Sequence, residues 1–451
     1  MNNRAINFTE GKILGPLLKF AVPILLGAFL HALYGAVDLL IVGRFSLAAD
    51  VSGVSTGSML MSTLTSLVAS LSVGLTVFLA EMVGQKNEKE GGRIIGSGIV
   101  MFFVIAVVMM AVISGGAGFL AQLMNAPEEA MVQTTQYIRI CGLGFVIIIA
   151  YSLISGVFRG IGDSVTPLIA VIIACIANIG GDLLLVGGLN MGAKGAAIAT
   201  VAAQGLSVVL SLIMVRKKPL PFKLERGQIR PDGTIIKKII RIGAPLALQD
   251  VLSNFSFLAI LAIINGLGVI VSAGVGVAEK AVFFIMLIPL AFMQSLAAFV
   301  AQNRGAGKLD RAEKGLRYAV TVSFLISIVM FWLAFFHGDL LTGIFASDSA
   351  VIAAGTEYLK AYGIDILLVC FVFCFIGYFN GMERTRFVMI QGIACSFLIR
   401  LPIAFIMSRQ TPPVLFRIGL AVPASTAVQI LLCVIFFFWL RRKTRQESLG
   451  A

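Results

Sequence analysis

The stretch from Pro167 to Val186, PLIAVIIACIANIGGDLLLV, decides the fold class of this chain. It is apolar and long enough to cross a bilayer as a helix, since about 20 residues span the hydrocarbon core. Asn178 and Asp182 stand four residues apart in it, so a helix places both on one face, about 6 Å apart. A carboxylate at that depth costs about 2.5–3.5 kcal/mol, so we expect it to face protein or water rather than lipid. Gly180 and Gly181 would let a neighbouring backbone approach.

The composition extends this interpretation to the whole chain of 451 residues, of which 59% are hydrophobic and 13% charged. Apolar runs of about 20 residues recur along its length, which predicts an all-α integral membrane protein. A membrane barrel would need short alternating segments instead. The cysteines all fall inside apolar runs, where we expect them to pack rather than to form disulfides or bind a metal: Cys141, Cys175, Cys370, Cys374, Cys395 and Cys433.

We predict twelve transmembrane helices. Residues 1–15 lack the apolar core and cleavage site of a signal peptide, so we expect the first helix to be retained. The predicted spans are 16–42, 55–80, 94–120, 133–158, 167–187, 195–215, 239–267, 276–303, 318–337, 351–380, 389–408 and 418–440.

Basic residues predict the orientation. The net charge is +13, and the basic clusters 216–218 and 441–443 fall on the same side as the N-terminus. Because lysine and arginine favour the cytoplasmic side, both termini are predicted to be cytoplasmic in a multi-pass protein of the inner (cytoplasmic) membrane. The charge lies in short loops beside membrane helices, which argues against nucleic acid as a partner.

The chain is predicted to be a duplication. The polar, proline-containing segment 216–238 separates an N-lobe, 1–215, from a C-lobe, 239–451, each with six spans. Similar residues recur in the two lobes at nearly constant spacing: Gly84 with Gly305, Tyr137 with Tyr358, Gly142 with Gly363, and Pro23 with Pro245. An even number of spans per lobe makes this a parallel repeat, an arrangement typical of transporters that rock about a central cavity.

Several short motifs resemble those of the multidrug and toxic compound extrusion (MATE) family. The resemblance implies twelve helices in two pseudo-symmetric six-helix lobes and cation-coupled antiport of amphiphilic, often cationic, drugs. It also implies that the N-lobe positions bind the coupling cation. The matching residues are Pro23 and Asp38, Asn178 to Asp182, Gly195 to Thr200, and the loops Gly84 to Lys86 and Arg159 to Asp163.

A depth argument from the residues points to the same site. Asp38 lies in the outer half of the first span, Asn178 and Asp182 lie in that of the fifth, and Thr200 follows the outer start of the sixth. Carboxylate, amide and hydroxyl oxygens suit a small hard cation such as sodium. They would equally hold a proton, because a dry site with two carboxylates favours the neutral acid. The coupling ion stays open between the two.

Each of these residues also has a structural interpretation. Asp38 would accept a hydrogen bond at a helix contact, and Asn178 with Asp182 would form a packing network. Thr200 would bond to its own preceding turn, as membrane threonines commonly do. His31, two turns before Asp38, would either pack in the lobe or relay protons.

The C-lobe departs from a second copy of this site. Ser253 stands where the sodium-driven branch of the family with acids in its second lobe has a glutamate. The repeat partners of Asp38 and Asp182 are near Ile260 and Ile403. Asp365 and Arg400 form a possible secondary site, either as a salt bridge or as a contact for an anionic or zwitterionic substrate. The roles of Asp250, Glu279 and Lys280 stay open.

These observations favour an antiporter without a cofactor other than the coupling cation, acting as a monomer on a small amphiphilic molecule and surrounded by membrane lipid. The alternatives are a flippase or exporter of a lipid-linked or other amphiphilic substrate in the same superfamily, a channel, and a membrane enzyme. An enzyme is disfavoured because the two histidines, His31 and His337, form no catalytic or metal-ligand pattern. ATP-driven pumping is disfavoured because no Walker loop occurs.

Overall fold

The computed structural model describes residues 6–217, 222, 225–410 and 414–449, and its regular elements are helices throughout. Eleven of these helices are long and apolar enough to cross a membrane. A twelfth span results if the pair Glu128–Leu143 and Phe145–Ile161, bent by 51°, is counted as one. The prediction of an all-helical multi-pass membrane protein is therefore confirmed.

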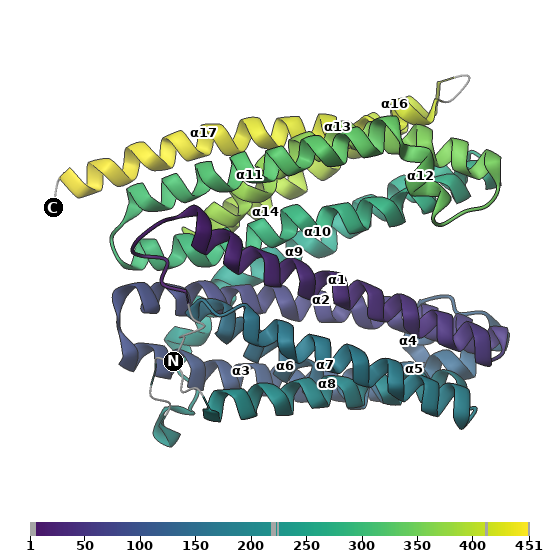
Figure 1. The fold of residues 1–451 in the computed structure, drawn as a ribbon, viewed down its shortest axis with the longest axis horizontal. Coiled ribbons are helices and arrows are strands. Elements are labelled where there is room, and N and C mark those ends of the chain that lie inside the picture. The colour runs from purple at the N-terminus through teal and green to yellow at the C-terminus, as the bar shows by residue number, and fades with distance from the viewer. Residues whose placement is uncertain (1–5, 218–221, 223–224, 411–413, 450–451) are drawn as a thin grey trace. The chain divides into compact units, whose positions relative to one another are not determined.

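The chain divides into two compact units. Unit 1 comprises Met1–Ala247 and Ala301–Lys308. Within it α1 packs on α7, α7 on α8, and α2 on both α5 and α6 (Figure 1). Its helices are α1 (Leu14–Phe45), α2 (Ala48–Gln85), α3 (Glu88–Gly115), α4 (Ala117–Leu123), η1 (Glu128–Ala130), α5 (Met131–Leu143), α6 (Phe145–Ile161), α7 (Val165–Asp182), η2 (Leu183–Gly188), α8 (Gly192–Lys217) and η3 (Arg226–Gln228).

Unit 2 comprises Leu248–Val300 and Leu309–Ala451. Helix α13 packs against α11, α12, α16 and α17 in this unit (Figure 1). Helices α9 (Gly233–Asn265) and α10 (Val269–Gly305) each begin or end in unit 1 and continue in unit 2. The remaining helices are α11 (Leu309–Phe336), α12 (Gly338–Gly343), α13 (Ser349–Gly381), α14 (Thr385–Cys395), η4 (Ser396–Arg400), α15 (Leu401–Ser408), α16 (Leu415–Gly419) and α17 (Ala421–Leu449).

Glycines set the close helix contacts in unit 1. A side chain at Gly53 would overlap Gln133, and one at Gly57 would overlap the ring of Tyr137, so α2 and α5 meet with little between them. Membrane helices use small residues in this way because lipid offers no hydrophobic incentive to associate, and packing must supply the attraction. Helix α2 is accordingly the inner helix of unit 1, with 67% of its most apolar window buried.

The first two residues of the predicted linker, 216–238, end α8 at Lys217, its last six begin α9 at Gly233, and the described residues between them form no regular element except η3. Its residues 218–221 and 223–224 lie outside the described part of the chain. The rest is fastened to α3: the Ser97 hydroxyl donates to the Arg230 carbonyl over 3.1 Å, and Arg93 pairs with Asp232 over 2.6 Å. The division at 215 and 238 stays a prediction, and the compact units divide the chain at other points.

Candidate functional site

Three helices of unit 1 carry the four residues predicted to bind a cation. Asp38 lies on α1, Asn178 and Asp182 on α7, and Thr200 on α8. Because α7 packs against both other helices, these positions can share one space. Asn178 and Asp182 are fully buried, and Asp38 and Thr200 are only 4% and 8% exposed.

The side chains meet without saturating one another. Asp38 interacts with both Asn178 and Asp182, which brings the amide and the two carboxylates together as predicted. Yet six buried polar atoms have no hydrogen-bond partner in the described part of the chain: Asp38 Oδ1, Asn178 Nδ2 and Oδ1, Asp182 Oδ1 and Oδ2, and Thr200 Oγ1. Leaving a buried polar group unsatisfied costs about 1–3 kcal/mol, and more for a charge. This oxygen-rich set therefore fits a small hard cation or a shared proton.

The backbone around Asp182 explains part of this arrangement. Gly181 faces α8, where an added Cβ would come within 3.0 Å of Ala199 Cβ, so the predicted close approach occurs there. The matching expectation for Gly180 is wrong, because that glycine has open space beside it. Immediately after Asp182 the helix widens into the π segment η2, a local distortion that is frequent at functional sites.

Two tyrosines border the site and were not among the predicted residues. Tyr34, one turn before Asp38 on α1, interacts with Asp38, Thr200 and Gln204. Tyr137 on α5 interacts with Asp38 and Thr200. The spacing of four between Tyr34 and Asp38 was a signal in the sequence. Tyr137 had appeared only as the repeat partner of Tyr358, and its position beside the acids depends on how α5 packs.

His31 occupies an aromatic environment. Its ring lies 6.1 Å from that of Tyr34 and 6.0 Å from that of Tyr151, with edge-on geometry in both cases. These contacts agree with a packing role in unit 1. The proton-relay interpretation stays untested.

Asp365 and Arg400 lie near each other in unit 2 but do not form the expected salt bridge. Both residues are buried, and they interact electrostatically. Arg400 Nη2 donates instead to the Ser253 carbonyl and the Ser396 hydroxyl, and its guanidinium lies 3.9 Å from the ring centroid of Phe257. Asp365 Oδ1 and Arg400 Nε have no hydrogen-bond partner among the described residues.

Glu279 is a half-buried acid of unit 2 that accepts hydrogen bonds from two tyrosines. Its Oε1 accepts hydrogen bonds from Tyr362 over 3.0 Å and from Tyr358 over 3.3 Å, and it also interacts with Arg400. Both tyrosines come from α13, whereas Glu279 comes from α10. The sequence showed Glu279 as a charge within a span but offered no sign of these partners.

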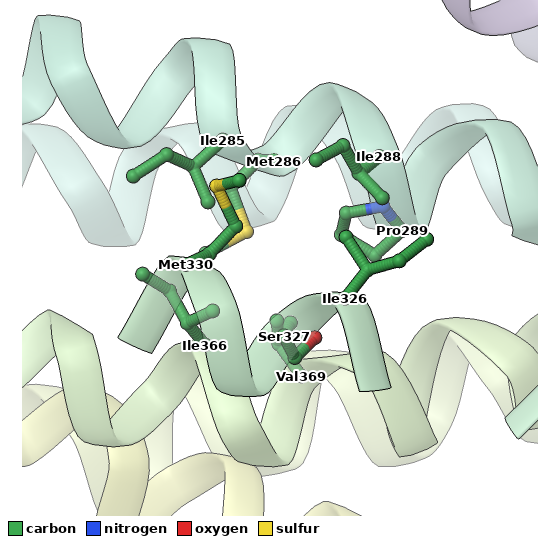
Figure 2. Close-up of a pocket in the computed structure, with 9 residues that line it drawn as sticks. All are labelled: Ile285, Met286, Ile288, Pro289, Ile326, Ser327, Met330, Ile366 and Val369. Atoms are coloured by element: carbon green, nitrogen blue, oxygen red, sulfur yellow. The ribbon is translucent and has the colours of Figure 1, made fainter. Parts of the chain in front are cut away.

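A small pocket opens between α10, α11 and α13 of unit 2 (Figure 2). Met286 and Met330 lie on one side of it, and the Ser327 hydroxyl is the polar group among its labelled residues. Ile366, next in sequence to Asp365, also lines it. The residues drawn around it are Ile285, Met286, Ile288, Pro289, Ile326, Ser327, Met330, Ile366 and Val369.

The fold and the buried acids together define a class of protein: a helical membrane transporter with an internal duplication and intramembrane ionisable residues. The MatE family model matches the chain twice, over residues 23–184 and 245–406. The chain therefore belongs to the MATE family of membrane transporters, which confirms the resemblance seen in the sequence.

Similar proteins agree with this assignment. A "Probable multidrug resistance protein YpnP" of Bacillus subtilis is 27% identical over 407 residues, which cover 88% of this chain and 87% of that protein. A "Multidrug export protein MepA" of Staphylococcus saprophyticus is 22% identical over 401 residues, with 89% and 88% covered. A solved structure described as an outward-facing multidrug resistance MATE family transporter of the MOP superfamily shares the fold, with a TM-score of 0.89, 18% identity and 98% of both chains covered.

Proposed function

We propose that this protein exports amphiphilic, often cationic, drugs or toxic compounds by exchanging them for sodium ions or protons. Membership of the MATE family and the names of its relatives support drug export. The observation that carries the coupling is the group of buried, unpartnered oxygen atoms of Asp38, Asn178, Asp182 and Thr200. Such a group is costly to keep dry, and a cation or proton would offset that cost.

The mechanism follows from linkage. A cation drawn between the acids of α1 and α7 favours the arrangement that brings these helices together, and the substrate favours the other arrangement. Coupling requires only that each ligand bind the two states unequally, and differences of about 1–3 kcal/mol are typical. Pro23 lies inside α1, where its missing N–H gives the helix a place to bend. Inward flow of the cation then drives export.

The membrane setting belongs to the same proposal. The chain acts as a monomer among lipids of the inner (cytoplasmic) membrane, with both termini in the cytoplasm. The basic residues at positions 216–218 and 441–443 support this orientation, since lysine and arginine are retained on the cytoplasmic side.

Transport of a lipid-linked anion is the alternative function, and unit 2 offers an argument against it. Arg400 is the buried cation that would receive a phosphate, but Glu279 and Asp365 both interact with it. Two carboxylates around one guanidinium offset its charge and would repel an anion.

The test is transport in liposomes that contain the purified protein, a fluorescent cationic dye, and sodium and pH gradients imposed separately. We expect one of the two gradients to drive dye movement. Asp38→Asn and Asp182→Asn should each reduce the driven rate about 5- to 150-fold, the range that corresponds to typical coupling free energies.

The matched control is Asp50→Asn, which makes the same change in unit 1 away from the site. Asp50 accepts a hydrogen bond from the backbone N–H of Ala193 over 2.9 Å, and an asparagine can keep that bond. This variant should transport normally. Full gradient dependence in both site variants would show that the cation site lies elsewhere, and dye flux that ignores both gradients would indicate a channel.

A further inference from the structure

At the end of unit 1 that contains the segment Ile6–Thr9, one carboxylate forms ion pairs with two basic residues from two other helices. Glu81, in the last turns of α2, receives Lys238 Nζ from α9 and Arg304 Nη2 from α10 on its Oε2 atom, each over 2.8 Å. The Glu81 side chain is only 15% exposed, so solvent screens these pairs less than it would at an open surface. Lys238 also lies over the ring of Phe78, 3.9 Å from its centroid.

Glycines let the same helices touch backbone to backbone. A side chain at Gly84 would overlap the Gln302 carbonyl, and one at Gly305 would overlap the Glu81 carbonyl. Farther along α2, Gly74 lies against the backbone of Gly243 on α9 in the same manner. At these three glycine contacts backbone meets backbone with no side chain between, so separating the helices there would break the Glu81 ion pairs with little local repacking.

The segment Ile6–Thr9 lies across this end of unit 1 and is held there by three hydrogen bonds. The Asn303 side chain donates to the Phe8 carbonyl over 3.1 Å, and Lys308 Nζ donates to the Thr9 carbonyl over 3.0 Å. The Ile6 N–H donates to the Gly162 carbonyl over 3.0 Å. Phe8 itself is fully buried and meets the ring of Phe20 edge-on at 5.1 Å.

The partners of Glu81 lie on α9 and α10, the helices that run from unit 1 into unit 2. The Glu81 contacts therefore hold the ends of the two helices that connect the units. We propose that Glu81, Lys238 and Arg304 form a releasable latch, reinforced by the segment Ile6–Thr9, that holds the ends of α9 and α10 against α2 and releases them during transport. This inference rests on the proposed function, since alternating access requires one end to open while the other closes.

The latch predicts where the chain becomes mobile when its charge is removed. In Glu81→Gln, hydrogen exchange measured in lipid nanodiscs should rise about fivefold in the segments around residues 78–85, 238–247 and 301–308 and remain unchanged elsewhere, because two partly buried ion pairs are lost. Arg304→Gln, which leaves the Lys238 pair in place, should give a smaller rise in the same segments. Glu90→Gln, which removes the ion pair with Arg93 within α3 of unit 1, is the control and should leave them unchanged.

A cross-link tests whether the latch opens during transport. With Glu81→Cys and Arg304→Cys in one protein, a short bifunctional thiol reagent should lower the rate of dye export about tenfold or more. That factor corresponds to at least about 1.4 kcal/mol. Cleaving the link should restore export. The single cysteine variants treated alike are the controls, and they also report any reaction at the native cysteines, of which Cys175 is half-buried and the other five are buried.

The outcomes separate the latch from the proposed function. Unchanged exchange in Glu81→Gln, faster exchange across the whole chain, or continued export by the cross-linked protein would each overturn the latch. The latch would be supported if the cross-linked protein lost export but sodium or protons still raised its thermal stability, because the site in α1 and α7 would still bind its ion. Failure of the proposed function would appear instead as the absence of any response to sodium or pH gradients.

Discussion

Each unit buries acids inside a membrane bundle, yet the two treat them in opposite ways. In unit 1, neither carboxylate oxygen of Asp182 has a hydrogen-bond partner within the described part of the chain, whereas in unit 2 Glu279 accepts hydrogen bonds from two tyrosine hydroxyls. The tyrosines also correspond: Tyr137 and Tyr358 are repeat partners, and each lies beside the acid of its own unit. The duplication thus kept an aromatic hydroxyl next to a carboxylate in both units, but among these acids only Glu279 receives hydrogen bonds from its tyrosines. Asp365, a buried acid of unit 2, keeps one oxygen without a partner among the described residues.

The difference bears on the proposal that the acids of unit 1, rather than Glu279, bind the coupling cation. A satisfied acid stabilises the fold and gains little from a cation. An unsatisfied acid weakens the fold until something binds it, a trade-off that is common at functional sites. The repeat partners near Ile260 and Ile403 complete the contrast: Ile260 belongs to the hydrophobic core of unit 2, and Ile403 packs against it.

The largest expected effect comes from forcing unit 2 to imitate unit 1. Ile260→Asp places a carboxylate in a core position that is 4% exposed, where the nearby hydroxyls of Tyr358 and Tyr362 already bond to Glu279. We expect a loss of stability of at least about 2.5–3.5 kcal/mol, or failure to fold. Thermal unfolding of the detergent-solubilised protein measures it.

Ile260→Val is the matched control for that substitution and should cost about 0.5–1.5 kcal/mol, as methylene deletions in cores do. An Ile260→Asp protein with an unchanged unfolding midpoint would break the comparison. It would mean that unit 2 can hold a second unsatisfied acid at the repeat position.

Neutralising the two native acids should change stability in opposite directions. Asp182→Asn removes a buried carboxylate that lies beside Asp38 and whose oxygens accept no hydrogen bond from the described residues, so the unfolding midpoint without sodium and at neutral pH should stay constant or rise. Glu279→Gln weakens two charge-assisted hydrogen bonds and should lower stability by about 1–2 kcal/mol. The same thermal unfolding assay compares the two variants directly.

Ligand addition sharpens this contrast. If sodium is the coupling ion, it should raise the midpoint of the native protein and of Glu279→Gln, but not that of Asp182→Asn. If the coupling ion is a proton, a decrease in pH should raise the midpoint of the native protein and of Glu279→Gln, but not that of Asp182→Asn. Equal destabilisation by both neutralising substitutions would show that the acids of unit 1 are structural as well.

Much of the fold and part of this contrast could be predicted from the sequence. Apolar length located the spans, and the four-residue spacing of Asn178 and Asp182, with the equal depth of Asp38, brought those side chains together. The partners of Glu279 could not be foreseen, because they depend on how α10 packs on α13. The expected pairing of Arg400 with Asp365 also depended on local backbone, since Arg400 ends a π segment and donates to Ser253 and Ser396 instead.

The smallest expected effect concerns Asp232, an acid outside the membrane spans. It precedes α9 and accepts hydrogen bonds from the backbone N–H groups of Ile235 and Thr234, and it pairs with Arg93. The bond from Ile235 is the largest cause that holds the pKa of Asp232 below its usual value, and Arg93 adds to it. Unlike Asp182, this acid accepts hydrogen bonds on both carboxylate oxygens, so it serves as the half-buried, satisfied reference for the comparison.

A lowered pKa gives the pH dependence its sign. The ionised Asp232 contributes stability above the usual aspartate pKa of about 3.9, and the contribution disappears as the pH falls through the lower pKa of the folded state. Asp232→Asn retains the ability to cap α9 but loses the charge. Its unfolding midpoint should therefore lie slightly below that of the native protein at pH 7 and converge with it in acid. A difference that widens in acid would contradict the assignment and remove Asp232 as the satisfied reference against which the unsatisfied Asp182 is judged.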